Sequence, residues 1–354
     1  MIKGRAELDR ICEEVLDAAE LDNIAGIAAG IMAGDEICTG ARGYRNAESG
    51  APMKPETVFH CASISKTFTS TAVMKLVEEG KLALSDKLAE VLPYLSIEDK
   101  RSEKIEINHM LSHISGLQDA AELGWTAGLT GDDALRSYAF SDEVTKRPML
   151  GEPGKCEPMY SDMAYDLLGL VVQEVSGQPF EAYIKNNFFE PAGMKNTTFL
   201  TFERTGGSLK LEDFDKAEIA MPHVKSADGH LSVESMFPYT RQHAPSSTLT
   251  SNIEDLLKWG RYNLDKKAVS EESYDKLWTE RVHIPDKFAM MGMGWFSRNE
   301  FGHSFIGHEG GDVGFRTSFW TCPECDAVMV ILANTTEAPI EPLTEKFYMS
   351  MNRL

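Results

Sequence analysis

Runs typical of β-strands occur near both ends of this chain, and a long helical stretch separates them. Residues 24–32 and 37–43 are small and apolar on either side of Ala33-Gly34-Asp35, which predicts a β-hairpin. Strand-like runs return only after residue 285. They are residues 293–297, 303–308, 315–321 and 327–334. We expect the two groups to pair into one antiparallel sheet, so that the middle of the chain is an insertion.

Apolar residues at helical spacing predict the remaining elements. A first helix is expected over residues 6–21 and a last one from Pro342 onward, both beside the sheet. Further helices are expected over 67–80, 104–112, 161–176, 179–188 and 252–264. The predicted fold class is therefore α/β (α+β). One domain comprises residues 1–98 and 285–354, a mainly helical domain comprises 99–284, and the active site lies between them.

Composition excludes several classes of function. The chain has 354 residues, of which 42% are apolar and 25% charged, enough for a large core in two domains or one composite one. Its net charge of −20 repels phosphate backbones and anionic lipid heads, so we expect neither nucleic acid nor membrane as a partner. No run reaches the ~20 apolar residues that span a bilayer, and the first residues lack a secretion signal, so we expect a cytoplasmic protein.

The metal and cofactor motifs are weak. Cys322-Pro-Glu-Cys325 is the one close cysteine pair, and a zinc ribbon needs a second, so we interpret Pro323-Glu324 as a hairpin turn. His109 and His113 have a spacing that suits a metal, but a third ligand is not evident and a structural turn is favoured. Neither a phosphate-binding loop nor a dinucleotide fingerprint is present. We expect no metal and no cofactor.

Ser63-Ile-Ser-Lys66 places a hydroxyl and an amine on one face of a helix, within mutual reach. Serine is a poor nucleophile without a base and a site for the developing negative charge. A neutral lysine can be that base if its pKa, ordinarily ~10.4, falls by roughly three units, at about 4 kcal/mol. Ser273-Tyr-Asp-Lys276 repeats the spacing, but among acids, and is interpreted as a charged helix surface.

Other stretches accompany Ser63 in a fixed order. The first is PETVFHCASISKTFTSTAVMKLVEEGKLALSDKLAEVLP, followed by INHMLSHISGL and GEPGKCEPMYSDMAYDLLGLVVQEVSGQPF, then PAGMKNTTF, STLTSNIEDLLKW, MGWF and GHEGGDVGFRTSFW. This series resembles the serine β-lactamase and penicillin-binding-protein superfamily, in particular its branch of class C enzymes, family VIII esterases and DD-peptidases. The resemblance covers nearly the whole chain and implies that family's fold.

The resemblance also implies roles for individual residues. Ser63 is the acylated nucleophile, Lys66 the base that deprotonates it, and Tyr160 the group that passes the proton to the leaving group and later activates water. His308 stands where many relatives have lysine. A histidine there can hydrogen-bond the tyrosine or a substrate acid, but it is mostly neutral near pH 7. The backbone N–H groups of Ser63 and Gly311 form the oxyanion hole.

Two residues depart from the family pattern. Asp162 replaces the usual asparagine, and a carboxylate that accepts from Lys66 holds the amine more strongly protonated. We expect Asp162→Asn to improve amide or β-lactam acylation. Glu309 can point to either face of its strand, and in the cleft it would disfavour anionic substrates. The expected substrate-binding residues are Asp162, Glu309, Gly310, Gln118 and Trp125, the last two in an irregular wall at 118–130.

The expected function is hydrolysis of a small-molecule ester, with amides as a further possibility, through an acyl-enzyme on Ser63. The missing secretion signal and His308 argue against β-lactamase activity, which stays an alternative together with D-amino-acid peptidase or amidase activity. An alternative of another class is a catalytically silent binding module, supported only by Asp162 and by the lack of a defined substrate. A serine-reactive probe distinguishes these classes.

Overall fold

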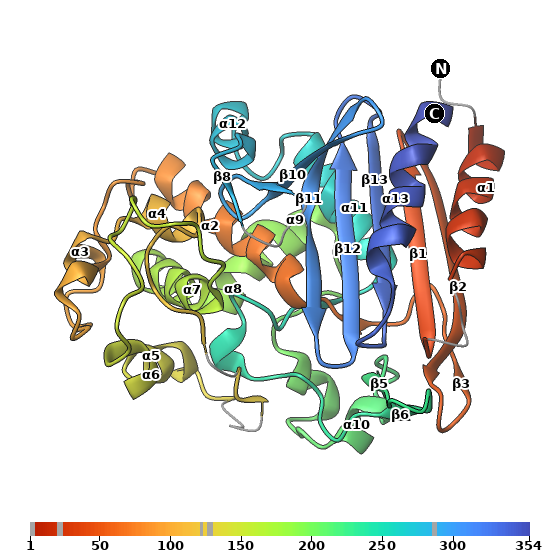
Figure 1. The fold of residues 1–354 in the computed structure, drawn as a ribbon, viewed down its shortest axis with the longest axis horizontal. Coiled ribbons are helices and arrows are strands. Elements are labelled where there is room, and N and C mark those ends of the chain that lie inside the picture. The colour runs from red at the N-terminus through yellow and green to blue at the C-terminus, as the bar shows by residue number, and fades with distance from the viewer. Residues whose placement is uncertain (1–3, 20–23, 121–122, 126–129, 285–288) are drawn as a thin grey trace.

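The computed structural model describes residues 4–19, 24–120, 123–125, 130–284 and 289–354, and nine strands of these residues form one antiparallel sheet (Figure 1). The strands are β1 (Gly26–Ala33), β2 (Glu36–Asn46), β3 (Ala51–Pro52), β8 (Val282–His283), β9 (Met290–Met291), β10 (Phe296–Glu300), β11 (His303–Asp312), β12 (Phe315–Cys322) and β13 (Ala327–Ala333). Their order across the sheet is β3-β2-β1-β13-β12-β11-β10-β9-β8.

The two groups of strands meet at the pair β1 and β13. Ile27 lies opposite Ala333, and the register continues to Ala33 opposite Ala327. Every residue of both strands is buried, because helices cover both faces of the sheet at this point. The expectation of one antiparallel sheet from both parts of the chain is confirmed.

Helices form a layer on each face. On one face, α1 (Gly4–Asp17) and α13 (Ile340–Ser350) enclose a core with Ile27, Ile331 and Trp320 (Figure 1). On the other, α11 (Ile253–Leu264) packs on β1 and β13. The assignment of residues 1–98 with 285–354 and of 99–284 to separate domains stays a prediction, and α11, from the middle segment, lies directly on the sheet.

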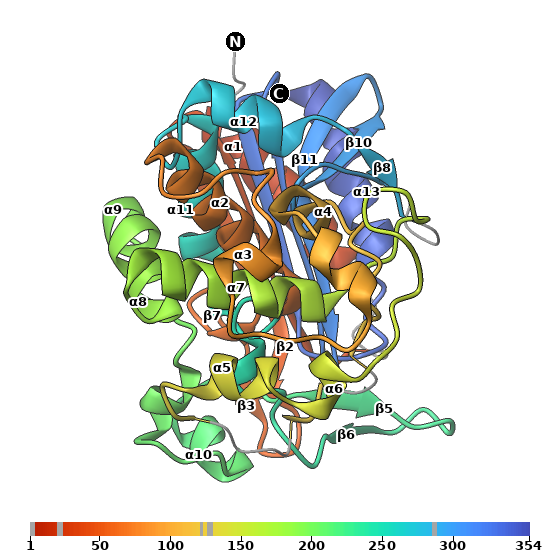
Figure 2. The ribbon, with the colours of Figure 1, turned by 90° about the vertical axis from the view of Figure 1, so that its left-hand side faces the viewer.

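Most of the remaining helices lie beside the second face of the sheet, where α2 (Ser65–Glu78) packs against α7 (Asp162–Ser176) (Figure 2). The shorter ones are α3 (Leu88–Val91), α4 (Ile107–Leu111), α5 (Ala134–Ala139), α6 (Asp142–Thr145), α8 (Phe180–Ile184), α9 (Glu190–Ala192), α10 (Leu211–Lys216) and α12 (Glu271–Trp278). Small two-stranded pairs are β4 (Phe59–His60) with β7 (Thr250–Ser251), and β5 (His223–Lys225) with β6 (Leu231–Val233). None of the helices in the described residues has the length and apolar character to cross a bilayer.

Several expected elements have different bounds, and three of the differences have a clear local reason. The helix expected over 104–112 covers only Ile107–Leu111, because Ile105 is extended and its carbonyl accepts from Leu88 N at 2.8 Å. The strand expected over 293–297 begins at Phe296, since Gly294 has a φ of +74°. The first helix ends at Asp17, and residues 20 and 21 lie outside the described residues.

Candidate active site

Ser63 lies in the 3₁₀ turn η1 (Ala62–Ile64), which leads directly into α2. Ala62 has a φ of +48°, a left-handed backbone conformation that residues other than glycine rarely adopt. Ser63 is partly exposed although Ala62 and Ile64 beside it are fully buried. Strain of this kind clusters at functional sites, and here it accompanies the one hydroxyl of the turn that solvent reaches.

Lys66 lies one turn further along the chain, with its amine beside Ser63. Its Nζ donates to Ser63 Oγ at 3.1 Å and to the backbone carbonyl of Ser246 at 2.9 Å, and it contacts Asp162 Oδ1 directly. The side chain of Lys66 is fully buried. The amine therefore has three fixed acceptors, one of which is the candidate nucleophile.

Tyr160 completes the cluster from the other side. It stands just before Ser161, the N-cap of α7, and its ring stacks on His113 with centroids 4.5 Å apart. The amine of Lys66 lies over this ring, with Nζ 4.7 Å from its centroid. Burial raises the pKa of Tyr160 to about 12 against the attraction of Lys66, so the phenol is neutral at pH 7. A neutral phenol can accept one proton and donate another.

The charge of Lys66 depends on Asp162. Burial alone lowers the pKa of the amine, but the charge of Asp162 and its hydrogen bond outweigh this effect and hold the pKa above the ordinary value. The amine is therefore an ammonium in the resting protein. Asp162 is the first residue of α7, where the helix N-terminus favours a carboxylate.

A second carboxylate, Asp119, lies behind Asp162. Asp119 Oδ1 accepts from the backbone N–H of Asp162 at 2.7 Å. Burial and the charge of Asp162 raise the pKa of Asp119 to about 6. The two acids give the Lys66 side of the site a negative character. Sequence reasoning missed Asp119 because nothing in its local pattern distinguishes it.

The strand β11 forms the wall opposite Tyr160. It pairs with β10 only as far as Gly307, and beyond that point it lies against η1. A Cβ on Gly310 would lie 2.5 Å from the carbonyl oxygen of Cys61 and 2.3 Å from Thr317 Oγ1, so only glycine allows this approach. His308, on the same face of β11, is buried with its ring centroid 6.2 Å from that of Tyr160. Gly311 directly follows Gly310.

Glu309 points away from the site, which corrects its assignment as a substrate-binding residue. Successive side chains of a strand alternate between faces, so Glu309 faces opposite to His308 and Gly310. Its carboxylate forms an ion pair with Arg298 at 3.2 Å, and Arg298 in turn bonds to Glu341 of α13. Glu309 therefore belongs to the layer of α1 and α13.

Gln118 and Trp125 lie on the side of the site formed by the irregular segment 118–130. The amide of Gln118 donates to the carbonyl of Pro148 at 2.6 Å. The ring of Trp125 stands edge-on to His60 and to His243, with centroids 6.2 and 6.0 Å away. Residues 121–122 and 126–129 of this wall lie outside the described residues.

His109 and His113 have structural roles, as the sequence favoured. His109 Nδ1 accepts from Glu106 N at 3.1 Å at the start of α4. His113 Nδ1 accepts from the backbone N–H of Ser161 at 3.0 Å while its ring supports Tyr160. His113 therefore positions Tyr160, a role that sequence reasoning did not assign.

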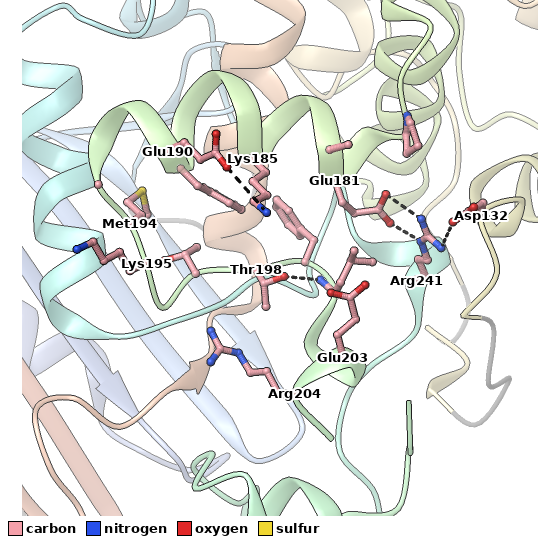
Figure 3. Close-up of a pocket in the computed structure, with 17 residues that line it drawn as sticks. Asp132, Glu181, Lys185, Glu190, Met194, Lys195, Thr198, Glu203, Arg204 and Arg241 are labelled. Carbon is pink, nitrogen blue, oxygen red and sulfur yellow. Dashed lines mark hydrogen bonds and ion pairs between the residues drawn. The ribbon is translucent and has the colours of Figure 1, made fainter. Parts of the chain in front are cut away.

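A cavity of about 960 Å³ lies away from this cluster, between α8, α9 and the segment 193–204 (Figure 3). Charged side chains line it, among them Lys185, Lys195 and Arg204, with the ion pair of Arg241 and Glu181 at one end. None of Ser63, Lys66 and Tyr160 is part of its lining. This cavity therefore does not hold the chemistry of the cluster.

An antiparallel sheet flanked by helices, with serine, lysine and tyrosine joined where the two layers meet, is the arrangement of the serine β-lactamase and penicillin-binding-protein superfamily. The chain belongs to the Beta-lactamase family, whose model matches residues 15–347. It is 26% identical over 352 residues to Protein flp of Staphylococcus aureus (strain N315), covering 97% of this chain and 65% of that protein. The chain thus spans less than two thirds of this relative's length.

Another relative is the putative penicillin-binding protein PbpX of Bacillus subtilis (strain 168), 27% identical over 77% of this chain and 62% of that protein. Among solved structures, the octameric penicillin-binding protein homologue from Pyrococcus abyssi is 25% identical, with a TM-score of 0.81 over 98% of this chain and 77% of that chain. The D-amino acid amidase from Ochrobactrum anthropi SV3 has a TM-score of 0.82 at 18% identity, over 98% of this chain and 99% of that chain. The amidase supports the fold.

Proposed function

We propose that this protein is a serine hydrolase that cleaves small-molecule esters through an acyl-enzyme on Ser63. The observation that carries the proposal is the 3.1 Å contact between Lys66 Nζ and Ser63 Oγ, with the ring of Tyr160 beside the same amine at 4.7 Å. A nucleophile and a base within hydrogen-bond reach, the base oriented by a third group, are the structural signature of covalent acyl transfer. Ser63 and Tyr160 are partly exposed, while Lys66 between them is buried.

The proposed reaction has two stages. Ser63 Oγ attacks the ester carbonyl, its proton moves to the neutral amine of Lys66, and the N–H groups of Ser63 and Gly311 bind the oxyanion. Tyr160 then donates its proton to the departing alkoxide and is reprotonated from Lys66, which leaves the acyl-enzyme. In the second stage Tyr160 and Lys66 take a proton from water, which attacks the acyl carbonyl. The C–Oγ bond then breaks, the same proton returns to Ser63 Oγ, and the acid leaves.

Lys66 must lose its proton before it can act as the base. Starting from an ordinary lysine pKa of 10.5, this costs roughly 5 kcal/mol at pH 7, and Asp162 makes the cost larger. Asp162 is in direct contact with the ammonium and stabilises its charge. The reaction therefore starts from the small fraction of molecules in which Lys66 has lost its proton.

Two features favour esters. An alkoxide departs more readily than an amine, so an ester demands less of a base that is mostly protonated. In addition, His308 stands where many relatives have lysine, and a histidine is mostly uncharged at neutral pH, so it binds the carboxylate of a β-lactam less firmly than a fixed cation does.

A second candidate substrate class is amides and esters of amino acids with a free amino group. Asp162 and Asp119 lie together beside Lys66, and an ammonium on the substrate can pair with them. That cation would compete with Lys66 for Asp162 and lower the pKa of the lysine, which frees the base as the substrate binds. The D-amino acid amidase among the similar folds supports testing the D series.

The first experiment compares hydrolysis of short-chain p-nitrophenyl esters, a chromogenic cephalosporin and the p-nitroanilides of D- and L-alanine by wild type and Ser63→Ala. We expect ester turnover that is lost in the variant. Preference for a free-amino substrate would support the second class, and its N-acetylated form is the matched control. Turnover retained in Ser63→Ala would contradict both.

A catalytically silent binding module is distinguished by a fluorophosphonate probe. The hydrolase proposal predicts covalent labelling of wild type and none of Ser63→Ala. Absence of labelling in correctly folded wild type would favour the binding module.

A further inference from the structure

Three metal-ligating side chains converge at one end of the sheet, outside the site described above. His303 begins β11, Cys322 ends β12, and Cys325 lies in the turn before β13. One ligand atom from each lies within 4.8 Å of the other two, and Cys325 Sγ is 3.4 Å from His303 Nδ1. We propose that these residues bind a soft divalent metal ion, Zn²⁺ above all, in a structural site.

The spacing fits a tetrahedral zinc ion. Bond lengths of about 2.3 Å to sulfur and 2.1 Å to nitrogen give edges of about 3.6–3.8 Å between ligand atoms. The contact between Cys325 and His303 already has nearly this length. Two cysteines separated by two residues are also the usual half of a structural zinc site, with the pair supplied here by one tight turn.

A second interaction fixes the orientation of His303. Its Nε2 is 3.2 Å from Asn352 Oδ1, on the 3₁₀ turn η7 (Met351–Arg353) that follows α13. Because the amide oxygen can only accept, Nε2 carries the proton and Nδ1 presents its lone pair to the sulfur. Metal-binding histidines almost always have such an acceptor on the other nitrogen.

The fourth position has a candidate on the same turn. Glu324 Oε2 is 3.7 Å from Cys322 Sγ and accepts from Ser304 N at 3.3 Å. A carboxylate oxygen is an accepted zinc ligand, and water is the other occupant of a site with three protein ligands.

The two thiols are protonated in the metal-free protein. Burial raises the pKa of Cys322 and of Cys325 above the ordinary value of a thiol. A metal ion would displace both protons, because the thiolate is the ligand. Binding is therefore expected to release two protons and to strengthen by up to about 100-fold per pH unit below the pKa values of the thiols.

The site is separate from the catalytic cluster. His308 lies five positions after His303 on β11, a distance of about 17 Å along an extended strand. The ion would join the β10–β11 turn, the β12–β13 turn and the segment after α13. The turn expected at Pro323-Glu324 is present, and the partner that the sequence did not reveal is His303, brought in by the pairing of β11 with β12.

The test is titration of the reduced, metal-free full chain with Co²⁺, read from the charge-transfer absorption of thiolate–cobalt bonds, followed by displacement with Zn²⁺. We expect one equivalent to bind. Cys325→Ser and His303→Ala should each weaken binding at least tenfold, and Asn352→Ala several-fold. Calorimetry in buffers of different ionisation enthalpy should count two protons released per ion.

Cys156→Ser and His283→Ala are the matched controls, because these residues lie outside the cluster and should leave binding unchanged. Circular dichroism checks that each variant folds. The proposal is overturned if wild type with free thiols gives no thiolate–cobalt band, or if the band persists with equal affinity in Cys325→Ser. Oxidation of Cys322 and Cys325 to a disulfide in place of metal uptake would equally overturn it.

Discussion

Ser63-Ile-Ser-Lys66 and Ser273-Tyr-Asp-Lys276 have the same spacing and lie in very different surroundings. Lys66 is fully buried and bonds to Ser63, while the side chain of Lys276 is 43% exposed and pairs with Glu272 at 2.8 Å. Ser273 is hydrogen-bonded to Ser270, the N-cap of α12. A three-residue spacing allows a serine and a lysine to meet, but burial decides whether they do. An exposed lysine pairs with the nearest surface acid instead.

The largest expected difference between the two copies is at the serine. Ser63→Ala should reduce ester turnover by roughly 10⁴-fold or more, because the acyl-enzyme then has no attachment atom. Ser273→Ala should stay within about twofold of wild type, since its hydroxyl serves only the start of α12. Initial rates with a p-nitrophenyl ester measure both, and equal losses would remove the distinction between the copies.

The second largest difference is expected for the loss of kcat/KM when the lysine of each copy is replaced. Lys66→Ala and Tyr160→Phe are each expected to lower kcat/KM by about 10²- to 10⁴-fold through loss of proton transfer. Lys276→Ala should leave it unchanged. Circular dichroism at the assay temperature establishes that the fold persists, and near-normal turnover in either active-site variant would refute the role of that residue.

The pH dependence of kcat/KM tests the pair of Lys66 and Asp162. The base form of Lys66 is populated only above its pKa, which Asp162 raises, so wild-type activity should rise with pH through the alkaline range. Asp162→Asn removes this stabilisation of the ammonium, so the rise should move down by about one pH unit or more. At pH 7 acylation would become about tenfold faster. An unshifted profile would mean that Lys66 does not titrate as the base.

The turn of Ser63 is packed against the strand β11, and in the described part of the chain Ser273 has no such neighbour. Substitutions in β11 should therefore change the stability of the protein. Gly310→Ala would push a methyl group against the carbonyl of Cys61 and should destabilise the protein by about 1–3 kcal/mol. At Gly311 the nearest atom is the flexible end of Arg316, 3.1 Å away, so Gly311→Ala should cost less. Urea unfolding measures the loss of stability in each variant. Equal losses would mean that β11 is not closely packed against η1 at Gly310.

The smallest effect concerns the surface pair of Lys276 and Glu272. A double-mutant cycle by urea unfolding should give a coupling of about 0.3–0.5 kcal/mol, as for exposed pairs one helical turn apart. A value as large as 2 kcal/mol would show that this copy is more than a solvated helix face.

Local patterns predicted much of this molecule. The strand runs and the helices beside Ser63 and after Tyr160 were predicted because their signals lie within short windows, and the spacing of Ser63 and Lys66 is itself local. Tyr160 was found through the family resemblance. The contact of Asp119 with Asp162 and the meeting of His303 with Cys325 depend on how distant segments pair, which no short window contains.

The direction of Glu309 illustrates a different limit. The strand itself was predicted, but the face of each side chain follows from the pairing of β11 with β12, where Glu309 lies opposite Ser318. A shift of one residue in that pairing would have exchanged the directions of His308 and Glu309. The sequence alone left both directions open.

The pairing of β1 with β13 has a consequence for synthesis of the protein. A ribosome adding about 5–20 residues per second makes β13 roughly 15–60 s after β1. During that time one edge of β1 has no paired strand. An unpaired apolar edge is prone to join other chains, and nascent copies of this protein should therefore depend on chaperones. The strand β11, which lies against the turn of Ser63, is also made late. The active site is therefore incomplete until β11 has been synthesised.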